Sequence, residues 1–185
     1  MKRLYALVFA LGVLTSVSAI DFDKPLWGLR GAVGTDISLV PAFGGELSLA
    51  FDSGDTPWLE FDLGYFYSFY RWEGSTYVEE TTSNIILLRA NRLFNYKPGN
   101  TGTFYFFGTG VGVVSVYWKE TSKINPAYLD EVSATGGGFI VSVGLGRTFN
   151  GKFEVKLDLP MLIIFGGYYG TRVSPMLGIG AGVRF

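Results

Sequence analysis

Apolar and polar residues alternate with a period of two over long segments, and this pattern constrains the fold more than any other feature. From 58 to 70 every odd position is apolar or aromatic, whereas the even positions include Glu60, Asp62 and Ser68. Such alternation predicts a β-strand with one apolar face, because successive side chains point to opposite sides. After the first 19 residues, no apolar run reaches the roughly 20 residues that a transmembrane helix needs.

Seven other segments complete a set of eight predicted strands. The odd positions of 139–145 and 153–159 are apolar. The segments 27–34, 42–51 and 175–185 follow the same rule with mainly small or polar residues opposite. In 104–118 the apolar face of Tyr105, Phe107, Val111, Val113 and Tyr117 lies opposite Phe106, Gly108, Gly110, Gly112 and Val114. The pattern is least regular in 84–94, where 85–88 is continuously apolar. We place Ile86, Leu88 and Ala90 on the apolar face there, because Arg89 and Asn91 then share the other.

The connections between these strands alternate in length. Asn150-Gly151 is a strong hairpin signal, and 52–57 and 95–102 are also short and rich in turn formers. The other connections are predicted as longer loops over 71–83, 119–135 and 165–174, with only 35–41 short. Short turns on one side and long loops on the other are typical of a barrel in an outer membrane.

An apolar strand surface without a long helix favours a membrane barrel. Inside hydrocarbon every backbone N–H and C=O needs an internal partner, so strands cross only as a closed barrel with apolar residues outside. The fold class predicted is therefore all-β, an eight-stranded antiparallel up-and-down transmembrane β-barrel. The alternative of a soluble ligand-binding barrel stays open at this point.

The first residues resemble a cleavable signal peptide. Lys2 and Arg3 precede the apolar run 4–14, and Ala19 ends a small-residue site, so 1–19 is predicted as the signal and 20–185 as the barrel domain. Without Lys2 and Arg3 the chain has 13 basic and 16 acidic residues, which argues against a nucleic-acid partner. The absence of cysteine excludes a disulfide framework and a thiolate metal site.

Nine charged residues fall on the predicted inner face. They are Arg30, Glu46, Glu60, Asp62, Arg89, Glu154, Lys156, Asp158 and Arg184. Charges are costly toward lipid, and an eight-stranded barrel has just enough interior for side chains. We therefore predict a lumen filled by paired charges rather than an open pore. The alternative is that some of these charge pairs gate a narrow path for conductance or transport through the barrel.

The last segment, PMLGIGAGVRF, carries the most specific motif. Leu177, Ile179, Ala181, Val183 and Phe185 share one face, with glycines and Arg184 on the other. This resembles the C-terminal assembly signal of Gram-negative outer-membrane proteins, which the barrel assembly machinery recognises. The chain as a whole resembles the small barrel family of OmpX, Ail and the OmpA membrane domain. The resemblance implies export to the bacterial outer membrane and contact with lipopolysaccharide.

Aromatic residues near the strand ends are predicted to form interface girdles, because amphipathic rings favour the headgroup region. They are Trp27, Trp58, Trp72, Trp118, Tyr65, Tyr67, Tyr96, Tyr105, Tyr117, Tyr168 and Tyr169.

No catalytic site, cofactor site or metal site is predicted. Barrel enzymes that modify lipid A, which this chain resembles in size, use a His with Ser and an acidic residue, and the sequence has no His. The favoured hypothesis is a non-enzymatic, monomeric surface barrel whose loops 71–83 and 119–135 contact host or envelope ligands. The alternative is a narrow channel or carrier for small, hydrophobic solutes, similar to OmpW.

Overall fold

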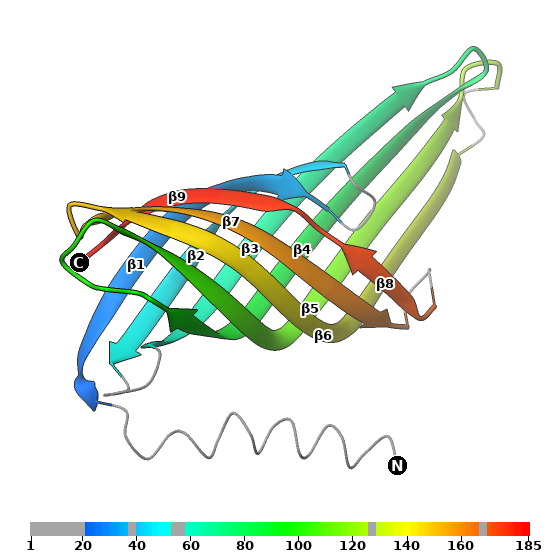
Figure 1. The fold of residues 1–185 in the computed structure, drawn as a ribbon. Coiled ribbons are helices and arrows are strands. Elements are labelled where there is room, and N and C mark those ends of the chain that lie inside the picture. Colours follow the sequence, from blue (N-terminus) through cyan, green and yellow to red (C-terminus); the bar gives the residue numbers. More distant parts are fainter. Residues whose placement is uncertain (1–20, 37–39, 53–57, 126–128, 167–169) are drawn as a thin grey trace, which may run out of the picture.

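A computed structural model describes residues 21–36, 40–52, 58–125, 129–166 and 170–185. The predicted signal peptide 1–19 lies outside these residues. The described chain is all-β, and no helix within it is long and apolar enough to cross a membrane. Its strands are antiparallel throughout (Figure 1).

The strands close into a ring of eight, which confirms the predicted fold class. In chain order they are β1 (Asp21–Thr35), β2 (Pro41–Asp52), β3 (Trp58–Glu73), β4 (Tyr77–Phe94), β5 (Gly102–Ser122), β6 (Leu129–Phe149), β7 (Phe153–Phe165), β8 (Arg172–Pro175) and β9 (Gly178–Arg184). Each strand from β1 to β6 pairs with the next one along the chain. The pairs β6–β7, β7–β9 and β9–β1 then close the ring.

β8 and β9 are two parts of one eighth strand. The pairs Met161↔Pro175 and Asp158↔Gly178 keep one register with β7 on both sides of the break. The Met176 amide still donates to the Pro160 carbonyl at 2.8 Å. Pro160 has no backbone N–H, so it cannot donate the second hydrogen bond of this pair to Met176. The ladder is therefore interrupted at Pro160 although the strand continues.

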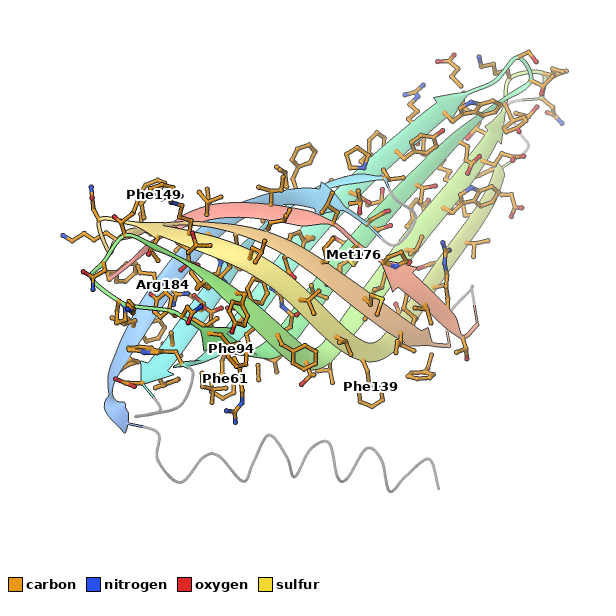
Figure 2. The ribbon with its side chains drawn as sticks, in the orientation of Figure 1. Phe61, Phe94, Phe139, Phe149, Met176 and Arg184 are labelled. Atoms are coloured by element: carbon orange, nitrogen blue, oxygen red, sulfur yellow. The ribbon has the colours of Figure 1, made fainter. Side chains whose placement is uncertain are left out.

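The outer surface of the ring is apolar, and the predicted strand faces are confirmed. Phe43, Leu63, Leu88, Phe139 and Ile179 are all exposed on it, and Figure 2 shows Phe139 projecting from the barrel wall. Ile86 and Leu88 are exposed while Ile85 and Leu87 are buried, as expected for 84–94. Phe51 and Leu59 are exceptions: both have the outward phase, but both are buried.

The predicted loops 71–83 and 119–135 are wrong as loops. The structure extends four strands through them, leaving only 74–76 and 123–128 as connections, of which 126–128 lie outside the described residues. We call this four-stranded extension the fin: 69–73 of β3, 77–82 of β4, 117–122 of β5 and 129–135 of β6. It rises beyond the rim at the end opposite the C-terminus (Figure 1). Apolar alternation fades there because polar and charged residues occur on both faces, while the strand pairing continues.

The tight turn predicted at Asn150-Gly151 is confirmed. Both residues have positive φ, 51° and 64°, as a type I′ hairpin turn requires. This turn joins β6 and β7 at the end of the barrel that holds the C-terminus (Figure 1).

Candidate functional site

The structure brings all nine predicted lumen charges into one cluster inside the ring. They come from β1, β2, β3, β4, β7 and β9, while β5 and β6 face them with small residues such as Gly108 and Ser142. Asp158 has the most exposed side chain of the nine, at 13%. The four cations and five carboxylates thus form a contiguous, nearly neutral group shielded from solvent.

Arg30 stands at the centre of this cluster. Its guanidinium lies 3.0 Å from Glu46, 2.9 Å from Asp62, 2.8 Å from Glu154 and 3.5 Å from Glu60. Four carboxylates from three strands therefore share one cation. Gly182, directly opposite on β9, leaves the space that the Arg30 side chain occupies.

Two further groups extend the network along the barrel. Glu60 accepts from Lys156 and Arg184, and Arg184 also donates to Glu154 at 2.6 Å. On the other side of Arg30, Arg89 donates to Glu46 and Asp158. Asn91 donates to Asp62 at 2.6 Å and joins the two parts. The period-two pattern placed Asn91 on the same inner face as Arg89, but the predicted network contained only charged residues and so left it out.

Apolar layers cover the charge cluster, and the sequence prediction missed them. One layer lies toward the fin and consists of Ala42, Phe66, Ile85, Leu87, Val114, Val116, Ile140, Leu162, Ile164 and Met176. A second is formed by Leu93, Tyr96, Phe104 and Phe106. The Lys156 ammonium lies 4.9 Å from the centre of the Phe106 ring. The Arg184 guanidinium carbon lies 4.9 Å from the centre of the Tyr96 ring. Arg184 and Met176 lie toward opposite ends of the barrel (Figure 2).

A small cavity lies where the cluster meets the first apolar layer. It has a volume of about 20 Å³ and is lined by Arg89, Asp158, Leu87 and Met176, among others. Arg89 Nε and Asp158 Oδ1 have no hydrogen-bond partner among the described residues. A space of this size holds about one water molecule, which is far smaller than a continuous path through the barrel.

At the end of the fin, the β3–β4 connection 74–76 contacts the segment that follows β5. The Lys123 amide donates to the Thr76 carbonyl at 2.8 Å, and the Lys123 ammonium lies 2.7 Å from Glu73. The hydrogen bond and charge of Lys123 lower the pKa of Glu73. The outward face of the fin carries Arg71, Glu80 and Lys119, which are costly in lipid. The fin therefore stands in water outside the bilayer.

The girdle interpretation is wrong for four of the aromatic residues. Trp58 shares the inward phase of Glu60 and packs against Tyr96 of the second apolar layer, with ring centres 5.5 Å apart. Trp72 and Trp118 belong to the fin and share the inward phase, where the Trp118 indole donates to Glu79 at 2.8 Å. Tyr96 is buried in the second apolar layer. Tyr168 and Tyr169 lie outside the described residues. Strand phase would have separated the two fin tryptophans from the outward-facing girdle, because both continue the inward phase of their strands.

The residues of the predicted assembly signal lie on the outer surface. Leu177, Ile179, Ala181, Val183 and Phe185 are all exposed, Phe185 at 71%. The backbone of Phe185 pairs with Trp27 through two hydrogen bonds of 2.9 and 3.0 Å. The last residues thus lie at the seam that joins the eighth strand to β1.

A closed ring of eight strands with an apolar outside and a polar cluster inside is suited to lipid and not to water. These features define a small transmembrane β-barrel. No protein-family model matches the sequence, and the search of curated proteins gave no match.

Solved structures with this fold come from several bacteria. The N-terminal β-barrel domain of Pseudomonas aeruginosa OprF matches with a TM-score of 0.57 and 18% identity, over 88% of this chain and 100% of that one. Ail, the attachment invasion locus protein of Yersinia pestis, matches with a TM-score of 0.52 and 10% identity, over 87% and 96%. Neisserial surface protein A matches with a TM-score of 0.50 and 14% identity, over 86% and 94%. At these identities the similarity shows a common fold.

Proposed function

We propose that this chain is a non-enzymatic outer-membrane protein whose barrel is a closed scaffold and whose fin contacts molecules outside the cell. The observation that supports this most is the fin itself, a four-stranded sheet with polar residues on both faces that extends past the lipid-facing ring. Loops and extensions on a rigid scaffold are where binding functions concentrate. Ail, which shares the fold, has been solved with the heparin analogue sucrose octasulfate.

We also propose that the lumen is plugged. The charge cluster is held by ion pairs and lies against apolar residues, and the cavity beside it has room for about one water molecule. A conducting barrel would need a continuous wet path instead. The remaining partners proposed are lipopolysaccharide around the barrel and the assembly machinery during insertion, with the protein acting as a monomer.

The sidedness of the fin can be tested with single cysteines, because the natural chain has none. Ile124→Cys places a thiol at the fin tip, where Ile124 is 78% exposed. Lys152→Cys places one at the β6–β7 turn, at the opposite end of the barrel. We expect a membrane-impermeant maleimide to label only the first variant on intact cells and both variants after permeabilisation. Labelling of Lys152→Cys alone on intact cells would reverse the proposed orientation.

The plugged lumen predicts that the purified protein has no channel activity. In planar bilayers we expect no reproducible unitary current, because no ion can pass the packed layers without breaking buried ion pairs. A 16-stranded porin reconstituted in parallel serves as the positive control, since such barrels leave an aqueous channel. Reproducible unitary currents from the pure protein would instead favour the channel hypothesis.

A further inference from the structure

The two faces of the fin carry their charges in different order. On the outer face Arg71, Glu80, Lys119 and Glu131 lie directly opposite one another on successive strands, so the sign alternates across the sheet. Arg71 and Glu80 form an ion pair of 3.5 Å. The adjacent row on the inner face is Trp72, Glu79, Glu120 and Asp130. Three carboxylates therefore stand side by side.

This inner row has no compensating charge within the described fin. None of its inward-phase positions in β3, β4, β5 and β6 is a lysine or arginine, and no ion pair joins Glu79, Glu120 or Asp130 to a cation among the described residues. Like charges directly opposite each other destabilise a sheet. A cation supplied by a partner would remove that repulsion.

Aromatic side chains lie next to the carboxylates. The rings of Trp72 and Tyr77 are 5.0 Å apart, and the Trp118 indole holds Glu79 through the hydrogen bond described above. Tyr70, on the same face, is 40% exposed, and Trp72 is 41% exposed. Aromatic faces attract ammonium and guanidinium groups. Rings and carboxylates on one face thus favour the same kind of ligand, an organic cation.

We propose that the inner face of the fin docks a basic, extended segment of another protein. Neighbouring strands are about 4.8 Å apart, so three carboxylates span about 10 Å, and alternate side chains of an extended peptide repeat at about 7 Å. A chain with several lysines or arginines can therefore meet the whole row, whereas one small cation meets only part of it.

Other ligand classes fit this face less well. No group of three or more acidic residues within the described chain is arranged to hold a metal ion. A sulfated ligand of the kind solved with Ail would meet the carboxylate row and be repelled. The inference rests on the proposed function, because it requires the fin to be accessible from outside.

Binding of a labelled peptide to the folded full-length barrel in detergent tests the proposal. The probe is Lys-Ser-Lys-Ser-Lys-Ser-Lys, followed by fluorescence anisotropy. Combining Glu79→Gln, Glu120→Gln and Asp130→Asn should weaken binding about tenfold. The matched control combines Glu73→Gln, Glu80→Gln and Glu131→Gln, which removes the same charge elsewhere on the fin and should change affinity less than about twofold. Trp72→Ala should also weaken binding while leaving every charge in place.

The inner variant is expected to fold, because removing adjacent like charges relieves repulsion; heat-modifiable migration on gels checks this. Equal weakening by both triple variants, or no binding to the natural protein, would overturn the proposal. Binding of a neutral oligosaccharide in place of the peptide would also overturn it and indicate a glycan site. If Ile124→Cys is labelled on cells but the peptide does not bind, this inference fails while the proposed function stands. If that cysteine is not labelled, the proposed function itself fails.

Discussion

Replacing Arg30 with methionine is expected to lower the free energy of unfolding of the barrel by about 3–5 kcal/mol, because removing one partner leaves buried charges uncompensated. Arg30 contacts four carboxylates. Its loss leaves three cations facing five carboxylates in the cluster. Methionine is similar in length and keeps the apolar contacts of the side chain. Reversible urea unfolding in lipid vesicles measures the effect.

Two matched variants separate this effect from a general loss of charge. Glu60→Gln should destabilise less than Arg30→Met, because it leaves four cations facing four carboxylates and keeps a polar side chain for Lys156. Arg71→Met removes an arginine from the fin, where its side chain is 54% exposed and makes one 3.5 Å ion pair. That change should cost no more than about 1 kcal/mol. If Arg30→Met were as stable as Arg71→Met, the cluster would not be a stabilising feature of the lumen.

Replacing Phe185 with serine should sharply reduce the amount of barrel in the outer membrane while export across the inner membrane continues. The resemblance to the assembly signal predicts this, and the structure indicates why a folding defect is not the cause. The Phe185 ring is 71% exposed, and its structural contribution comes through backbone bonds to Trp27, which serine can also form. Immunoblots of outer-membrane and periplasmic fractions, with and without heating, measure the distribution.

Phe153→Ser is the matched control for this experiment. Phe153 is also outward-facing, at 52% exposure, and it pairs with Val183 at the same end of the barrel. Both variants lose one ring from the outer surface, so purified proteins should refold with similar stability. Only Phe185→Ser should lower the level in cells. Equal losses in cells would mean that surface hydrophobicity, rather than a signal at this position, governs assembly.

The sequence was informative wherever one face of a strand meets lipid and the other meets the lumen. Period two then placed Arg30, Glu60 and Lys156 inside and Leu63, Phe139 and Ile179 outside, in agreement with the burial observed. The same criterion failed in the fin, because a sheet with water on both sides needs no apolar face. It also could not indicate that Tyr96 is buried, since Tyr96 follows the end of β4 and its burial depends on ring contacts with Trp58 of β3 and Phe104 of β5.

By itself the sequence determined the strand phase, the closed barrel and the set of charges that avoid lipid, because a side chain's face follows from its position along a strand and from the solvent on each side. Only the tertiary structure decided which charges pair across the lumen, where apolar layers cover them, and how far the sheet extends beyond the ring. Those properties depend on the register between strands. The same register aligns Glu79, Glu120 and Asp130 in one row of the fin, although Glu79 and Glu120 are 41 positions apart along the chain.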